Sequence, residues 1–243
     1  HICRMAGCNS IVSDLLDENA LSVFHSNKLV KELLGSPSDL PHWTDRKNYI
    51  KKVKEYNKNI PVIFGGIHPT VLPDETLKNR NVDIVVRGEG EKSMVALINA
   101  MESGKSLDKV MGISYISNGN VLHNPDVSYI DNLDNIPFPA RHLLIDKEKY
   151  PPDTFGKIFA SRGCPYKCTY CASNKIWTRQ VRYMTPERVV DEIEYVMRNY
   201  KATNFYFEDD SYTIREKFVE RVCDLIIKRD INISWGCETR VNL

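Results

Sequence analysis

The sequence has 243 residues, of which 42% are hydrophobic and 27% charged, and its formal net charge is +1 at pH 7. This length allows one large domain or two modest ones, with enough hydrophobic residues for a buried core. The two charge signs are mixed and no apolar run is long enough to span a bilayer, so we expect a cytoplasmic protein with neither membrane nor nucleic acid as a partner.

The first part of the chain alternates helix-like and strand-like segments. They are a helix over residues 44–57, a strand over 61–64, a short helix over 74–78, a strand over 82–86 and a helix that begins at 88–91. This order predicts a parallel sheet with helices on its faces, in a domain over residues 1–110. Residues 1–43 do not offer the early strands that a complete domain of this kind would have.

Residues 111–155 interrupt this alternation. Asn118-Gly119 lies between two strand-like segments, which is the strongest short signal for a β-hairpin. The residues that follow are rich in proline, asparagine and aspartate. We expect a hairpin followed by a linker between domains.

A second alternation of strands and helices fills residues 156–243. Strands are expected over 157–161, 204–207 and 231–235, and helices are expected to start at Thr185-Pro186 and at a capping box, Thr213–Glu216. Such repeats fit part of a β/α barrel, in which the chemistry takes place at the carboxyl ends of the strands.

Three cysteines within eight residues follow the first of these strands: Cys164, Cys168 and Cys171. Thiolates this close in sequence converge on one metal centre. Three ligands are one short of a tetrahedral zinc site and of an ordinary iron–sulfur cube, so one metal position stays open for chemistry. A zinc site completed by Cys223, Cys237 or a histidine is the alternative. Disulfides are disfavoured because the chain has seven cysteines and no visible signal peptide.

Charged residues follow the next two strands. Glu208, Asp209 and Asp210 end the second strand, and Arg240 lies just past the third. These residues are also typical of a solvated turn, a helix cap and a solvated arginine, so their pattern alone decides nothing.

Together with the cysteine loop, residues 156–243 resemble the first half of a radical S-adenosylmethionine (SAM) barrel. The resemblance implies that the three cysteines hold a [4Fe–4S] cluster whose fourth iron is chelated by SAM. An electron donor such as flavodoxin or ferredoxin then drives cleavage of SAM to methionine and a 5′-deoxyadenosyl radical. The implied SAM contacts are Tyr170, Glu208, Asp209, Asp210, Thr239 and Arg240, with the acids facing its amino group, the arginine its carboxylate and Tyr170 its adenine.

The upstream half resembles the N-terminal domain of the cobalamin-binding radical SAM proteins. The resemblance rests on Gly65–Thr70 and on the segment from Val82 to Glu91. Glycines after a strand let the backbone approach a broad cofactor. The implied cobalamin contacts are Gly65, Gly66, His68, Pro69, Thr70, Gly88, Glu89 and Gly90. The cobalt-ligating motif Asp-x-His-x-x-Gly is absent, so His68 is expected to have a structural or loop role.

The fold class expected from these resemblances is α/β, a partial Rossmann-like sheet followed by half of a radical SAM barrel. The expected activity is cobalamin-dependent methyl transfer, or another radical modification, of a small-molecule substrate. One alternative is a methylthiotransferase acting on tRNA or protein, disfavoured because only Cys3 and Cys8 precede the loop and are expected to be ordinary thiols. The other is a non-catalytic fragment, since both ends of the sequence, His1 and Leu243, look truncated.

Overall fold

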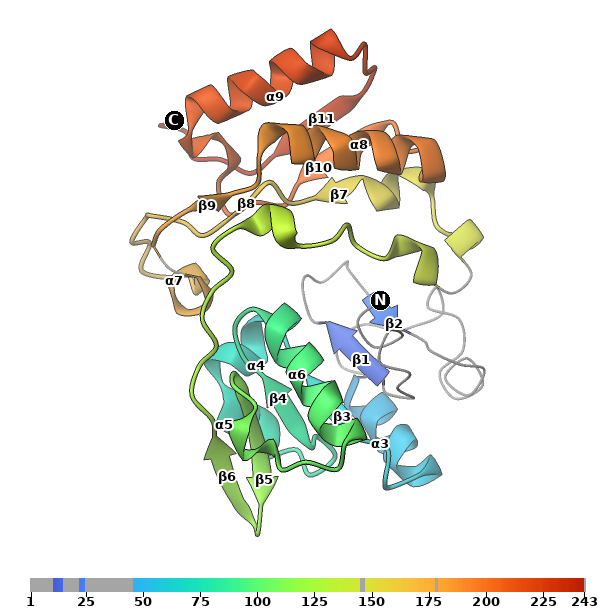
Figure 1. Cartoon of the computed structure of the whole chain (residues 1–243), viewed down its shortest axis with the longest axis vertical. Helices are drawn as coiled ribbons and strands as arrows, with labels where there is room; N and C mark the ends of the chain where they lie inside the picture. Colours follow the sequence, from blue (N-terminus) through green and yellow to red (C-terminus); the bar gives the residue numbers. More distant parts are fainter. Residues whose placement is uncertain (1–10, 15–21, 25–45, 145–146, 178, 243) are drawn as a thin grey trace. The chain divides into compact units, whose positions relative to one another are not determined.

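The structure is a computed structural model that describes residues 11–14, 22–24, 46–144, 147–177 and 179–242. The chain forms two compact units. The first comprises residues 1–129 and 140–147, and the second comprises residues 130–139 and 148–243. Each unit has its own parallel strands and its own helices (Figure 1).

Six described strands form the sheet of the first unit in the order β2-β1-β3-β4-β5-β6. They are β1 (Ile11–Asp14), β2 (Ser22–Phe24), β3 (Val62–Phe64), β4 (Ile84–Val86), β5 (Ile113–Ser117) and β6 (Asn120–His123). β1, β3 and β4 are parallel, as the alternating pattern predicts, and the outer strands are antiparallel. The expectation that residues 1–43 supply no early strands is wrong, because β1 pairs directly with β3.

The predicted hairpin is confirmed, but it is part of this sheet. β5 and β6 turn at Asn118 and Gly119, whose φ values of 51° and 79° are the left-handed values such a turn requires. β5 then pairs with β4, so residues 113–123 extend the first unit as its edge.

Helices cover both faces of this sheet. They are α3 (Arg46–Tyr56), α4 (Ile67–Val71), α5 (Pro73–Leu77) and α6 (Gly90–Glu102). Ile63, Ile84 and Val86 pack against the apolar stripe of α6, whereas Val62 and Val85 pack with residues of α3 and α5. Alternate strand residues therefore face opposite helix layers, as buried parallel strands do.

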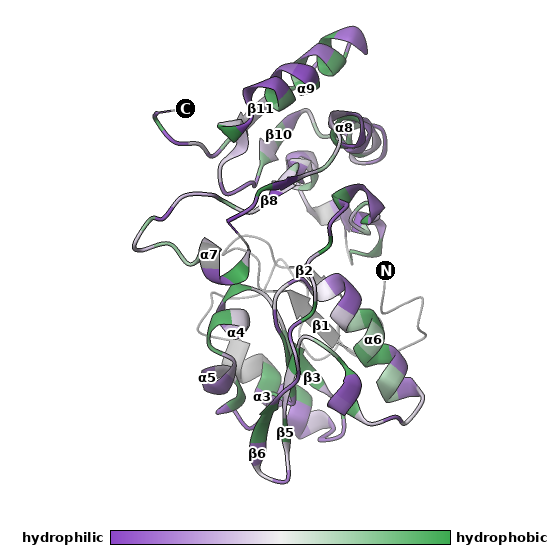
Figure 2. Ribbon diagram, turned by 60° about the vertical axis from the view of Figure 1, so that its left-hand side comes forward, coloured by the Kyte–Doolittle hydropathy of each residue, from purple (hydrophilic) through white to green (hydrophobic). Residues whose placement is uncertain are grey.

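The second unit contains a parallel sheet in the order β11-β10-β7. Its strands are β7 (Lys157–Ile158), β10 (Asn204–Phe207) and β11 (Ser234–Cys237), and its helices are α7 (Ser173–Ile176), α8 (Pro186–Tyr200) and α9 (Glu216–Lys228). α8 packs beside α9, whose buried residues lie on one side while hydrophilic residues cover the other (Figure 2). The parallel order confirms the predicted βα repeats.

The expected first strand is interrupted, because β7 ends at Ile158 and the chain resumes as β8 (Ser161–Arg162). β8 pairs antiparallel with β9 (Arg182–Tyr183) in a separate two-stranded ribbon. The third strand begins at Ser234, three residues later than expected. The remaining described elements are 3-10 turns at Leu107–Lys109, Leu133–Asn135, Arg141–Leu143, Lys147–Lys149, Pro152–Gly156 and Tyr212–Ile214.

One of the two predicted helix starts in this unit is confirmed. Thr185 caps α8 by accepting a hydrogen bond from the Arg188 backbone N–H at 3.2 Å. The predicted capping box at Thr213 is wrong, since α9 begins at Glu216 after Arg215 and no side chain caps it. The hydroxyl of Thr213 instead bonds that of Thr239.

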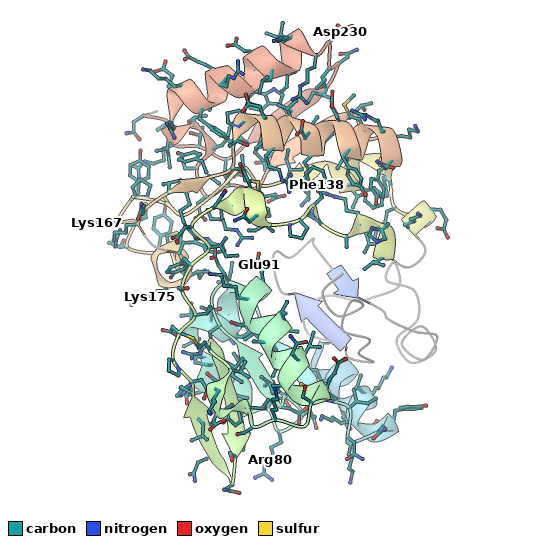
Figure 3. All side chains as sticks on the ribbon, viewed as in Figure 1. Arg80, Glu91, Phe138, Lys167, Lys175 and Asp230 are labelled. Atoms are coloured by element: carbon teal, nitrogen blue, oxygen red, sulfur yellow. The ribbon has the colours of Figure 1, made fainter. Side chains whose placement is uncertain are left out.

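The proline-rich segment 130–139 is part of the second unit and packs against α8. The ring of Phe138, which is labelled in Figure 3, stacks on that of Tyr195 with the centroids 5.2 Å apart. The Arg188 guanidinium lies 3.8 Å from the Phe138 centroid. Arg188 Nη2 also donates to the Ile136 carbonyl at 3.1 Å. Among the described helices, none is both long and apolar enough to cross a membrane.

Candidate functional site

The three cysteines lie in the loop that the β8–β9 ribbon closes. Cys164 and Cys168 are half-buried and Cys171 is exposed. The Cys171 backbone N–H donates to the Cys168 carbonyl at 3.3 Å, and the Ser173 N–H donates to Cys171 Sγ at 3.5 Å. The loop thus turns back on itself so that its thiols share one region.

The electrostatics of Cys164 indicate which groups surround it. Its pKa is raised, mainly because the thiol is partly buried. The negative charges of Asp210, Cys171 and Cys168 raise that pKa further. The three cysteines and the end of β10 therefore lie within electrostatic range of one another.

This donor set fits an iron–sulfur cluster. The loop supplies three sulfur ligands on one short segment, which suits a cluster with one iron left open. Among the described residues, no three His, Cys, Asp or Glu side chains are already arranged around one metal position. The fit therefore rests on the chemistry of the three thiols, their short spacing along the chain and the effect of Cys168 and Cys171 on the pKa of Cys164.

Asp209 has a different role from the one expected. Asp209 is only 1% exposed, and its carboxylate accepts hydrogen bonds from the Ala160 backbone N–H at 3.1 Å and from the Ser161 hydroxyl. Burial raises its pKa to about 6 despite these bonds. Phe205, Phe207 and Asp209 are all buried, so Asp209 continues the inward face of β10. It joins β10 to the start of the cysteine loop through these two hydrogen bonds.

Glu208 and Asp210 flank Asp209 in the chain and lie on the side of the strand opposite to it. Asp210 is exposed and its Oδ2 accepts a hydrogen bond from Ser173 Oγ at 2.6 Å. Glu208 Oε1 lies 3.1 Å from Lys157 Nζ. Asp210 is thus tied to the far end of the cysteine cluster, through a serine two residues after Cys171.

Arg240 also reaches the loop. Its guanidinium lies 4.1 Å from the Tyr166 ring centroid, and its Nη1 lies 3.6 Å from Cys168 Sγ. Thr239 bonds Thr213, and Tyr170 is 92% exposed. Sequence reasoning missed Ser161, Tyr166 and Ser173. Every second residue from Phe205 to Asp209 is buried. This alternation along a strand was the available signal that Asp209 faces inward and needs a buried partner such as Ser161.

In the first unit, the glycine loops follow β3 and β4 at the same edge of the sheet. The expectation that the first is a loop throughout is wrong, because His68, Pro69 and Thr70 belong to the helix α4. The Thr70 hydroxyl donates to the Gly66 carbonyl at 2.7 Å and accepts from the Gly88 N–H at 3.0 Å. Gly66 and Gly88 have φ values of 92° and 69°, which favour glycine.

The other expected cobalamin contacts differ in how far they are buried. Pro69 and Glu89 are buried, whereas His68 is half-buried. Gly90 is the first residue of α6, where an added Cβ would lie 3.9 Å from a Val86 methyl, an ordinary contact. Thr70 thus holds two glycine-bearing strand ends together at the edge where open parallel sheets bind ligands.

Comparison with known proteins identifies both units. Residues 36–98 match the B12 binding domain and residues 158–241 match the Radical SAM superfamily. The chain is 33% identical to the uncharacterized methyltransferase PH0819 of Pyrococcus horikoshii, over 88% of this chain and 47% of that protein. It is 35% identical to the anaerobic magnesium-protoporphyrin IX monomethyl ester cyclase of Rubrivivax gelatinosus, over 88% of this chain and 40% of that protein. The chain therefore spans less than half the length of these relatives.

Solved structures agree on the fold. The radical SAM methyltransferase TsrM of Kitasatospora setae, solved with tryptophan and a SAM analogue, matches 80% of this chain and 38% of its own, with a TM-score of 0.65 and 16% identity. The cobalamin-dependent SAM radical enzyme OxsB, solved with aqua-cobalamin and SAM, matches 86% of this chain and 31% of its own, with a TM-score of 0.66 and 21% identity. With both domain types present in this order, the chain belongs to the radical SAM proteins that carry a B12-binding domain.

Proposed function

We propose that this chain carries the cofactor-binding units of a cobalamin-dependent radical SAM enzyme that transfers a methyl group to a small-molecule substrate or modifies it by another radical route. The observation that carries the proposal is the link between the cysteine loop and the end of β10. Ser173 donates to Asp210 while its backbone N–H donates to Cys171 Sγ. Metal ligands and an acid suited to an ammonium group are thereby held together.

Within this proposal, Cys164, Cys168 and Cys171 hold a [4Fe–4S] cluster, which supplies one-electron chemistry when bound. The acids Asp210 and Glu208 lie on the side of β10 away from the buried face, and we assign them to the amino group of SAM. Charge-assisted hydrogen bonds of this kind are stronger than neutral ones. Asp209 is removed from the ligand set because its carboxylate serves Ala160 and Ser161. Tyr170 and Thr239 stay as proposed contacts of SAM.

Cobalamin is proposed to bind at the edge of the first sheet where β3 and β4 end. Its broad ring needs close backbone approach, which the glycines at 65, 66, 88 and 90 allow. Thr70, bonded to both loops, sets their spacing, and His68, Pro69 and Glu89 complete the proposed lining. No histidine is assigned to cobalt.

The relatives support a small-molecule substrate without identifying it. TsrM was solved with tryptophan, and the Rubrivivax relative is named for a porphyrin ester. We further propose that a flavodoxin- or ferredoxin-like protein supplies the electron and that the protein acts in the cytoplasm.

The test is anaerobic reconstitution of the full natural chain with iron and sulfide, followed by addition of SAM, cobalamin and a one-electron reductant. Wild type should retain about four irons and convert SAM to products identified by mass spectrometry. Cys171→Ala should lose the cluster, because two thiolates do not hold the cube. Cys223→Ala is the matched control, since Cys223 lies in α9 outside the loop, and should behave as wild type. Stoichiometric zinc without iron in wild type would contradict the proposal.

A further inference from the structure

Arg240 makes three contacts that fix its guanidinium beside the cysteine loop. The group lies 4.1 Å from the centroid of the Tyr166 ring, and its Nη1 lies 3.6 Å from Cys168 Sγ. Its Nε donates to Asn242 Oδ1 at 3.1 Å. Arg240 is exposed, so these three contacts, rather than burial, hold its guanidinium in place.

The ring explains why the side chain stays in place. A planar guanidinium stacks on an aromatic face and still presents N–H donors at its edge. Tyr166 lies between Cys164 and Cys168, so the stack ties the segment after β11 to the middle of the loop. One of these edge donors, Nη1, is directed at Cys168 Sγ.

A cation at a cluster sulfur has an electronic consequence. The potential of an iron–sulfur cluster depends on net charge, on hydrogen bonds to its sulfurs and on solvent exposure. Reduction adds one negative charge, so a nearby N–H donor and positive charge stabilise the reduced form more than the oxidised one. The contact therefore acts on the cluster without touching the substrate.

We propose that Arg240 is a positioning residue that raises the reduction potential of the cluster through Cys168. In this step the oxidised cluster gains one electron from an external one-electron donor, and Arg240 neither forms a bond nor transfers a proton. The inference rests on the proposed function, because it requires the cluster. It differs from the role expected from the sequence, in which Arg240 binds the SAM carboxylate.

Arg179 offers a matched control in the same part of the loop. Its Nη1 donates to the Tyr166 carbonyl at 2.8 Å. Both arginines thus hold Tyr166, one through its ring and one through its backbone, while the contact to a ligand sulfur belongs to Arg240. Removal of either cation loosens Tyr166, but removal of Arg240 alone changes the sulfur environment.

The experiment is a redox titration of the reconstituted full natural chain, followed by electron paramagnetic resonance of the reduced cluster, with iron content measured in parallel. Arg240→Gln should keep its iron and show about a tenfold lower ratio of reduced to oxidised cluster at a fixed potential, which is about 59 mV for one electron. Arg240→Lys keeps the charge but loses the planar stack, and should fall between. Arg179→Gln should titrate with wild type.

Several outcomes would overturn the inference. They are an Arg240→Gln protein that titrates with wild type, an Arg179→Gln protein that shifts equally, and weakened SAM binding in Arg240→Gln with an unchanged potential, which would return Arg240 to the SAM carboxylate. If Arg240→Gln loses its iron, Tyr166→Leu and Tyr166→Phe decide. The leucine variant should shift in the same direction and the phenylalanine variant should not, and equal potentials in this pair refute the idea. Wild type that retains no iron refutes the proposed function itself.

Discussion

The buried Asp209 makes a quantitative prediction about stability and pH. Burial raises its pKa from 3.8 to about 6 in the folded protein. Because the folded pKa lies above the unfolded one, the folded state binds the proton more tightly. The stability from this group is therefore fully present below pH 3.8 and is lost as the pH rises through 6. Each pKa unit is worth about 1.36 kcal/mol, so the loss is about 3 kcal/mol.

The perturbation is Asp209→Asn, which removes the titration but keeps a carbonyl oxygen for the Ala160 N–H. Urea denaturation of the cofactor-free protein, repeated between pH 3.8 and 7, gives the free energy of unfolding of the variant minus that of wild type. This difference should rise by about 3 kcal/mol across the range. Asp224→Asn, an exposed acid on α9, is the control and should show a flat difference. A flat difference for Asp209→Asn as well would refute the reasoning.

Three further predictions concern the proposed cofactor sites. Asp210→Asn should weaken SAM binding by about 1.5–3 kcal/mol in calorimetry while iron content stays at the wild-type level, because a charge-assisted bond is lost; unchanged affinity would leave this acid as only a partner of Ser173. Gly66→Val should abolish retention of hydroxocobalamin in gel filtration without loss of cluster absorbance. The reason is that the φ of 92° at Gly66 favours glycine and that the proposed approach of the corrin ring to the backbone leaves no room for a side chain. Full retention would move the cobalamin site elsewhere. Thr70→Val should lower the free energy of unfolding by about 1–3 kcal/mol, with Thr70→Ser near wild type, because the half-buried carbonyl of Gly66 and N–H of Gly88 lose their hydroxyl partner. Equal stability of the two variants would show that the link between the loops is not needed.

Much of the fold could be predicted because its signals are local. Apolar runs predicted the strands β3, β4 and β10, and Asn118-Gly119 predicted the hairpin. Thr185 predicted the start of α8, and the structure contains all of these elements. The failed capping box shows the limit of such signals. Thr213 has the right spacing from Glu216, but a hydroxyl from a residue 26 positions away engages it instead.

The candidate site divides in the same way. The cysteine spacing is a local signal and identified the loop. Glu208, Asp209 and Asp210 are three adjacent acids, and their different roles depend on which side of β10 each one faces. Arg240 and Tyr166 are 74 positions apart, and their stacking depends on how the sheet brings β11 and the loop together.

The β8–β9 ribbon has a consequence for how metal binding relates to folding. The pairs Ser161 with Tyr183 and Arg162 with Arg182 join the two ends of the segment 163–181, which contains all three cysteines. Bringing together the ends of a free segment of this length costs about 2–3 kcal/mol of chain entropy. In this protein the pairing of β8 with β9 and the hydrogen bond between Ser161 and Asp209 offset that loss of chain entropy without bound iron. In contrast to small zinc domains that unfold without metal, this protein should lose its iron to a chelator and keep its fold.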